Sequence, residues 1–172
     1  MQYTTAPVSI RLAVPDDAPM MAEVIMRSWE AAYKGIIPED FIMQKNSTRL
    51  EQARASFSRE NTTRYVIELD KNIVGIMTVA PPNDDDVDES FYELHNIYLL
   101  PEYYRQGIGT IAMEFAYQIA RDLGKTEMTV WLLAENLSAK RFYEKCGFTT
   151  DGSLKITEYG IPLQSIRMRK TL

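Results

Sequence analysis

Residues 98–109, YLLPEYYRQGIG, constrain the fold more than any other part of the chain. This segment joins an apolar run to a proline-marked turn and then to two glycines, Gly107 and Gly109. Beyond the second glycine, apolar residues recur at helical spacing, and Gly124 is placed to end that helix. The segment therefore predicts a strand that passes into a helix through a loop with little side-chain bulk.

This loop is expected to bind an anion. The first backbone N–H groups of a helix have no partner inside the helix, and the aligned peptide dipoles make that end partly positive. Because Gly107 and Gly109 have no side chains, the backbone can approach a diphosphate closely. The expected ligand is a nucleotide-like cofactor.

Two common nucleotide-binding motifs fit this loop poorly. A P-loop is excluded because no Gly-Lys-Ser/Thr follows the glycines. The dinucleotide pattern G-x-G-x-x-A does fit Gly107, Gly109 and Ala112. However, PEYYRQ separates the strand from the first glycine, and the next carboxylate past a strand, Glu135, lies beyond the expected ~20 residues. A dinucleotide-dependent enzyme is kept as the less favoured alternative.

Two blocks of the chain, ELHNIYLLPEYYRQGIGTIAM and NLSAKRFYEKCGF, resemble the GNAT superfamily of acetyl-CoA-dependent N-acetyltransferases. The family's motif A, Q/R-x-x-G-x-G/A, aligns on the two glycines and puts Tyr104 at its first position, where a phenol cannot supply an arginine's charge although Arg105 beside it can. Residues 9–41 and 160–172 resemble the family's first strand and helix and its last strand. The second block matches the pattern N-x-x-A-x-x-F-Y-x-x-x-G-F at Asn136, Ala139, Phe142, Tyr143, Gly147 and Phe148.

The resemblance implies an α+β, GNAT-like fold with a central mixed, mostly antiparallel β-sheet flanked by helices, in one domain over residues 1–172. It implies an enzyme that transfers an acetyl group from acetyl-CoA directly to a primary amine of a small-molecule or protein acceptor. An acyl-CoA-binding module without turnover is the alternative from another class, and Tyr104 keeps it open. Assembly as a homodimer is left open.

The residue pattern itself places the elements. Asp16 is predicted to cap the first helix and Gly35 to end it, and Asp70 to Asn72 form the turn of a hairpin. Strands are predicted at 8–14, 65–69, 73–80, 91–99 and 126–133, with a final pair after them, and helices at 16–33, 38–43, 47–58, 107–123 and 136–146.

Acetyl transfer needs a base, because a protonated amine has no lone pair with which to attack. Glu93 and His95 lie two apart in a predicted strand and so share a face. His95, the only histidine, has an ordinary pKa of ~6.5, whereas Glu93 needs burial to raise its pKa. The resemblance favours Glu93, acting directly or through water.

The departing thiolate needs an acid, and the resemblance assigns that role to Tyr143. The alternative for Tyr143 is an aromatic in a core stripe with Ala139 and Cys146, and both can hold because a phenol donates while its ring packs. In the family, a bulge in the strand before the glycine loop frees backbone amides for the thioester and pantetheine. The expected cofactor-binding residues are Ile97, Tyr98, Leu99, Tyr104, Arg105, Gln106, Gly107, Ile108, Gly109, Thr110, Asn136 and Tyr143.

Other features narrow the function less. A net charge of -5 disfavours nucleic acid, and Cys146, the single cysteine, favours a reducing compartment. Without an apparent signal peptide or a membrane-length apolar run, the expected location is cytoplasmic, with no membrane partner. No residues show metal-ligand spacing, so no metal is expected.

Two further segments allow two interpretations each. The acidic residues 83–89 form either a solvated loop or an attractor for a cationic acceptor. Trp29, Tyr33 and Phe41 form either a core cluster or, as the resemblance implies, one wall of the acceptor site. Asn136 is equally suited to cap its own helix.

Overall fold

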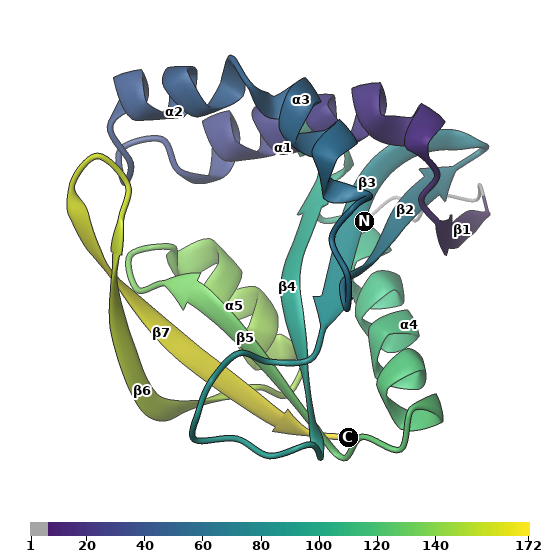
Figure 1. The fold of residues 1–172 in the computed structure, drawn as a ribbon, viewed down its shortest axis with the longest axis vertical. Helices are drawn as coiled ribbons and strands as arrows, with labels where there is room; N and C mark the ends of the chain where they lie inside the picture. Colours follow the sequence, from purple (N-terminus) through teal and green to yellow (C-terminus); the bar gives the residue numbers. More distant parts are fainter. Residues whose placement is uncertain (1–6) are drawn as a thin grey trace.

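A seven-stranded sheet with helices on both faces organises residues 7–172, the part of the chain that the computed structural model describes (Figure 1). The strand order is β1-β2-β3-β4-β5-β7-β6, and only the β4–β5 pair is parallel. The strands are β1 Val8–Leu12, β2 Thr63–Leu69, β3 Asn72–Ala80, β4 Phe91–Leu99, β5 Glu127–Leu133, β6 Thr149–Glu158 and β7 Pro162–Thr171. The helices are α1 Ala18–Ala32, α2 Glu39–Asn46, α3 Arg49–Ser56, α4 Ile108–Asp122 and α5 Leu137–Lys145, with short 3-10 turns at Pro15–Asp17 and Pro101–Tyr103.

The predicted α+β class with a mixed, mostly antiparallel sheet is confirmed. The predicted single domain and the expected absence of a signal peptide both include residues 1–6, which lie outside the described residues. Within residues 7–172, none of the helices has both the length and the apolar character needed to cross a bilayer.

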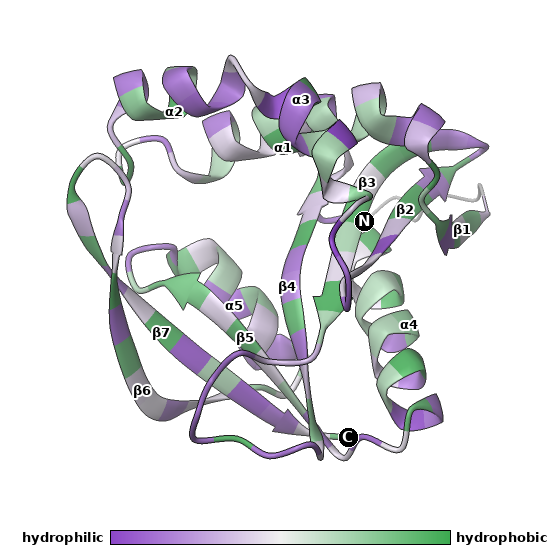
Figure 2. Cartoon of the chain, in the orientation of Figure 1, coloured by the Kyte–Doolittle hydropathy of each residue, from purple (hydrophilic) through white to green (hydrophobic). Residues whose placement is uncertain are grey.

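The alternation of side chains along the strands separates two cores. Neighbouring residues on a strand point to opposite faces, so Ile67 and Met77 join the cluster with α4 and α5, while Val66 and Ile76 join the cluster with α1 and α3. Figure 2 shows hydrophobic and hydrophilic residues alternating along α4, as expected for a helix with one face on the sheet. The two helical layers therefore hold the sheet rigidly from both sides.

The ends of the elements follow the predicted signals with one correction. Asp70 and Lys71 adopt positive φ angles of 51° and 65°, which gives the expected hairpin between β2 and β3. The predicted cap at Asp16 is wrong, because Asp16 lies inside the 3-10 turn and α1, whose N-cap is Asp17, has no side-chain cap. The carboxylate of Asp17 instead accepts the N–H of Val14 at 2.8 Å. Asp17 is held there by Arg11, whose guanidinium donates to it at 2.8 Å, and a local pattern cannot show that partner from β1.

A bulge in the middle of β4 sets the geometry on which the site depends. Thr78 pairs with Asn96 but Val79 pairs with Leu94, so His95 is an extra residue in β4. The parallel ladder with β5 stops at Leu94, and the two strands diverge beyond it (Figure 1). Alternate backbone groups of β4 past this point face the β5 side without a strand partner.

Candidate active site

The opening between β4 and β5 holds a pocket of about 240 Å³. It lies where the parallel ladder stops, and its lining comes from four strands and from the segments after α1 and β6. The lining residues are Tyr33, Glu93, His95, Tyr98, Trp131, Leu132, Leu133, Lys155, Thr157, Tyr159 and Ser165. The two predicted bases and one of the three predicted backbone contributors therefore share one cavity.

Glu93 and His95 point into this pocket together, as their spacing predicted. The His95 Nε2 and Glu93 Oε1 atoms lie 3.4 Å apart. Burial raises the pKa of Glu93 to about 7, and the negative charge of Asp84 adds to the shift. Burial lowers the pKa of His95, and the charges of Arg64 and Lys155 lower it further. Glu93 is thus the group of this pair that can exchange a proton near neutral pH.

Tyr143 lies on α5, inside the cluster formed with α4. Its ring packs edge-on against Phe142 and Phe148, which fits the predicted core stripe. Burial raises its pKa well above the ordinary value, and Tyr98 is the next largest influence. No group among residues 7–172 hydrogen-bonds its hydroxyl. The phenol therefore stays protonated and has a proton to donate.

Tyr98 contributes a side chain, whereas only its backbone was expected to act. The extra residue at His95 shifts the alternation of β4, so that Leu94 and Ile97 face the α4 layer and Tyr98 faces the pocket. Its hydroxyl accepts the indole N–H of Trp29 at 3.2 Å. A sequence pattern does not reveal a bulge, so nothing in the sequence indicates that the side chain of Tyr98 faces the pocket.

Aromatic side chains close the pocket on the side of α1 and α2. Trp29 packs edge-on against Tyr33 and Tyr159, and Phe41 packs edge-on against Tyr159. Burial raises the pKa values of Tyr33 and Tyr159, so both phenols keep their protons. Trp29, Tyr33 and Phe41 form a packed cluster, as one of the two interpretations states, and Tyr33 alone of the three lines the pocket.

The glycine loop has the backbone geometry of an anion cradle. Arg105 and Gly107 adopt positive φ angles of 60° and 83°, and the first helical bond runs from the Ile111 N–H to the Gly107 carbonyl at 3.2 Å. The N–H groups of Ile108, Gly109 and Thr110 precede that bond and have no partner within α4. A Cβ at Gly107 would meet no atom within 4 Å, so the approach is open. This loop fits a diphosphate.

Side chains around the loop differ in what they offer. Ile108 is fully buried, so only its backbone can face a ligand. Tyr104 is 40% exposed, and Gln106 donates to the Glu102 carbonyl at 2.8 Å. At Gly109 a Cβ would lie 3.1 Å from the ring of Phe142. The absence of a side chain at Gly109 therefore also allows α4 and α5 to pack.

Asn136 caps α5, as the alternative to cofactor binding proposed. Its side-chain oxygen accepts the backbone N–H of Ala139 at 3.1 Å. The side chain is buried, and its cap fixes the start of the helix that carries Tyr143. Nothing in this arrangement brings Asn136 into the pocket of Glu93.

The acidic residues 83–89 are not simply a solvated loop. The buried guanidinium of Arg167 on β7 binds Asp84 at 3.1 Å, Asp86 at 2.7 Å and Asp151 at 2.6 Å. Asp84 also accepts the indole N–H of Trp131 at 3.0 Å. The loop is thereby fastened to the sheet beside Glu93, and the carboxylate of Asp84 adds to the raised pKa of Glu93.

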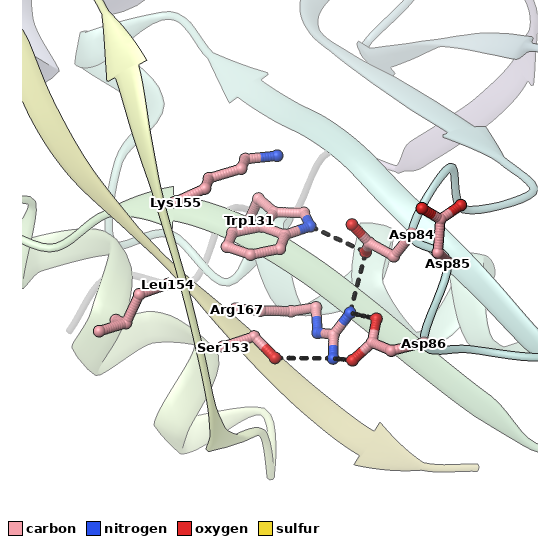
Figure 3. Close-up of a pocket in the computed structure, with 8 residues that line it drawn as sticks. All are labelled: Asp84, Asp85, Asp86, Trp131, Ser153, Leu154, Lys155 and Arg167. Atoms are coloured by element: carbon pink, nitrogen blue, oxygen red, sulfur yellow. Dashed lines mark hydrogen bonds and ion pairs between the residues drawn. The ribbon is translucent and has the colours of Figure 1, made fainter.

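These residues line a second, more open pocket of about 400 Å³. Figure 3 shows Arg167 between Asp84 and Asp86, with Lys155 extending across the ring of Trp131. Trp131 and Lys155 also line the pocket of Glu93, so they form the boundary between the two cavities. Neither residue was expected at the site, because the register of β5, β6 and β7 decides which of their side chains meet.

Among residues 7–172 no group of His, Cys, Asp and Glu side chains could hold a metal ion.

Comparisons with known proteins agree with this geometry. A model of the acetyltransferase (GNAT) family matches residues 23–148. The N-acetyltransferase YuaI of Bacillus subtilis is 29% identical over 131 residues, which cover 76% of this chain and 75% of YuaI. The spermidine N(1)-acetyltransferase of Thermoplasma acidophilum is 26% identical over 162 residues, which cover 88% of this chain and 96% of that enzyme.

Solved structures share the fold. PaiA N-acetyltransferase of Thermoplasma acidophilum, in complex with coenzyme A, matches with a TM-score of 0.73 and 23% identity over 96% of this chain and 99% of PaiA. YncA of Salmonella typhimurium, solved with its cofactor acetyl-CoA, matches with a TM-score of 0.69 and 19% identity over 97% of this chain and 95% of YncA. The predicted GNAT-like fold is confirmed by these likenesses.

Proposed function

Because the chain belongs to the GNAT family of acetyltransferases, we propose that it is a single-domain enzyme that transfers an acetyl group from acetyl-CoA directly to a primary amine. The observation that carries this proposal is the raised pKa of Glu93, about 7, in a pocket that opens at the bulge of β4. A buried carboxyl with such a pKa is suited to accept a proton at neutral pH.

Glu93 is the proposed base. An amine acceptor enters the pocket largely as its ammonium form, since free alkyl amines have pKa values near ~10.4. Glu93 removes a proton from that ammonium, directly or through one water, and the freed lone pair can then attack. His95, 3.4 Å away, is held neutral by burial and is placed to orient the carboxyl of Glu93.

Tyr143 is the proposed acid. Its raised pKa keeps the O–H intact, and after burial the largest cause of that shift is Tyr98, which lines the pocket. A phenol with no other hydrogen-bond partner among residues 7–172 is free to donate to a sulfur that develops negative charge. General acid catalysis of this kind contributes ~10²–10⁴ in rate.

Acetyl-CoA supplies the acetyl thioester when it is bound. The backbone of Ile97, Tyr98 and Leu99, beyond the last β5 pair, is proposed to hold the thioester and pantetheine by hydrogen bonds. Residues 104–110 are proposed to hold the diphosphate through the N–H groups at the start of α4. Coenzyme A in PaiA and acetyl-CoA in YncA support this choice of cosubstrate.

The test is a screen for thiol release. Acetyl-CoA and a panel of primary amines are incubated with the protein, and free CoA is measured with a thiol reagent. We expect release that depends on both the amine and the protein, and a loss of about 10²-fold in Glu93→Gln, which keeps the size of the side chain but cannot accept the proton. Glu68→Gln, a change at an exposed pair with Arg11, is the matched control and should leave release unchanged.

A folded protein that binds CoA but releases no thiol with any amine would instead be the acyl-CoA-binding module. The departure at Tyr104 from the Gln or Arg of the family's motif is the one observation that favours this second candidate. We place the reaction in the cytoplasm, where the lone Cys146 stays reduced.

A further inference from the structure

Two side chains of opposite charge line the pocket of Glu93. Glu93 is the only carboxyl group that lines the pocket, and Lys155 is the only permanent cation there. The ammonium of Lys155 lies 4.0 Å from the centroid of the Trp131 ring. No carboxylate among residues 7–172 lies within ion-pair distance of it. The pocket thus presents a proton acceptor and an unpaired cation side by side.

A second cation, Arg49, lies beyond the tyrosines that line the same pocket. Arg49 on α3 is only 9% exposed, and its guanidinium stacks on Trp29 at 4.1 Å from the ring centroid. One nitrogen donates to Gln52 at 3.2 Å, but Nε and Nη2 are buried without a partner among residues 7–172. Its charge acts on Tyr33, Tyr98 and Tyr159, which all line the pocket.

The other buried arginine among residues 7–172, Arg167, is fully paired, because its guanidinium meets three carboxylates. An unpaired buried guanidinium is costly, and an anion near it would reduce that cost. The phenols of Tyr33 and Tyr159 do not supply that anion, because burial raises their pKa values.

We propose that the acceptor carries its own carboxylate close to its amine, as an α-amino acid does. Its ammonium meets Glu93, its carboxylate meets Lys155, and the buried charge of Arg49 favours the carboxylate from behind the tyrosines. The phenol O–H groups of Tyr33, Tyr98 and Tyr159 are available as further donors to it. This inference rests on the proposed acetyl transfer and narrows its substrate to amino-carboxylic acids.

Charge complementarity also argues against a polycation. A second ammonium in the acceptor would meet Lys155 in the pocket and the field of Arg49 behind it. The carboxylates of Asp84 and Asp86, in the neighbouring pocket, are already bound to Arg167. Discrimination between such acceptors depends on the repulsion of a second ammonium as much as on the attraction of a carboxylate.

The test compares matched acceptors in the thiol-release assay. L-phenylalanine, L-phenylalaninamide and 2-phenylethylamine share one apolar group and differ in the carboxylate, and L-methionine with 3-(methylthio)propylamine repeats the comparison. Spermidine is the polycationic probe. We expect kcat/KM for each amino acid to exceed that for its matched amine by about tenfold or more, as a hydrogen bond to a charged group implies. The kcat/KM for L-phenylalaninamide should be as low as that for 2-phenylethylamine, since both lack the carboxylate.

Variants then assign the preference to its residues. Lys155→Met keeps an apolar chain over Trp131 and should abolish the preference by raising KM for the amino acid alone. Lys71→Met removes the same charge from the β2–β3 turn, at the far end of β3, and should retain the preference. Arg49→Met should weaken the preference without lowering the thermal midpoint, since it removes an unpaired buried charge.

The outcomes separate the two proposals. If plain amines react as well as amino acids, or if Lys155→Met keeps the preference, the carboxylate inference is wrong while acetyl transfer stands. If no amine of any class releases thiol, the transfer itself is wrong and the inference falls with it. If Arg49→Met does not fold, the comparison of Lys155→Met with Lys71→Met decides the matter.

Discussion

Glu93 shows how burial and three nearby charges adjust the pKa of one carboxyl group. Burial is the largest cause of its raised pKa, Asp84 raises the pKa further, and Lys155 and Arg167 lower it. Since an ionised Glu93 is the active base, kcat/KM should rise with pH and level off above a pKa of about 7. The midpoint of this rise is measurable with any acceptor that reacts.

Changing Asp84 tests the assignment of that pKa. Asp84→Asn removes a negative charge that opposes ionisation of Glu93, so the midpoint should move to lower pH. Asp85→Asn changes the same loop at a residue that does not act on Glu93, so its midpoint should match the wild type. A pH profile that is identical in all three proteins would mean that another group is the base.

Tyr143 offers a contrast with its neighbour Tyr117. Tyr143→Phe should reduce turnover by ~10²-fold or more with CoA binding and stability nearly unchanged, because its hydroxyl has no partner to lose among residues 7–172. Tyr117→Phe loses the bond from its hydroxyl to the Cys146 carbonyl, 3.2 Å long, and should cost ~0.5–1.5 kcal/mol of stability with turnover intact.

Thermal unfolding and steady-state kinetics of both variants check this contrast. If Tyr143→Phe turned over within a few-fold of wild type, the phenol would be a packing residue and water would have to protonate the thiolate.

The sequence predicts some residues of the candidate site but not others, and the difference has a physical reason. Glu93 and His95 face one pocket because the period of two holds between them. Lys155 and Trp131 meet only because β5 and β6 each pair with β7 in a particular register. Register depends on contacts across the whole sheet, so no local pattern could place those two side chains together.

Among the elements, the α4–α5 contact is the one that a small change would disturb. Gly109→Val would put a branched side chain where the ring of Phe142 already lies, with 3.1 Å to a Cβ. Overpacking of this kind costs ~1–3 kcal/mol. Gly109→Val should therefore lower the thermal midpoint, and the added change Phe142→Ala should restore part of it by making room.

Gly107→Ala is the control for this prediction. Its Cβ would meet nothing within 4 Å, so the only cost is the strain of a positive φ of 83°, about 1–2 kcal/mol, and Phe142→Ala should not relieve it. A double variant of Gly109 and Phe142 that is no more stable than Gly109→Val would contradict the packing role. CoA binding, measured by its effect on the thermal midpoint, then tests the anion-binding role of the glycine loop separately.

The elements themselves could be predicted well where the signal is local. The hairpin between β2 and β3 follows from Asp70 and Lys71, which tolerate the turn, and α5 begins at the cap by Asn136. The bulge at His95 could not be read from the residues, since its cause is the pairing of β3 with β4. The expectation of a bulge in this strand comes from the family resemblance and not from the residue pattern.

For the whole molecule, Arg167 joins parts that lie far apart in the chain. It connects the loop of Asp84 and Asp86 to Asp151 of β6 through one buried guanidinium. Arg167→Met should lower the thermal midpoint by about 5 °C or more, because it leaves several carboxylates without their cation. It should also make residues 81–90 susceptible to a protease that cleaves at Asp.

Arg169→Met is the matched control on the same strand. Arg169 is about half exposed and pairs only with Glu127, so its loss should change the midpoint little. Equal effects of the two substitutions, or a loop that stays resistant in Arg167→Met, would show that the acidic loop is held by other contacts.

The order of strands has a consequence for synthesis on the ribosome. β7 lies between β5 and β6 and is the only strand that pairs with β6. A growing chain that has released β6 must therefore hold it without a partner until Pro162–Thr171 has also left the exit tunnel. Ser165 and Arg167 arrive with that strand. The cavity around Glu93, which Ser165 lines, is thus complete only after β7 has emerged, and a pause in translation between β6 and β7 would expose an unpaired strand to chaperones.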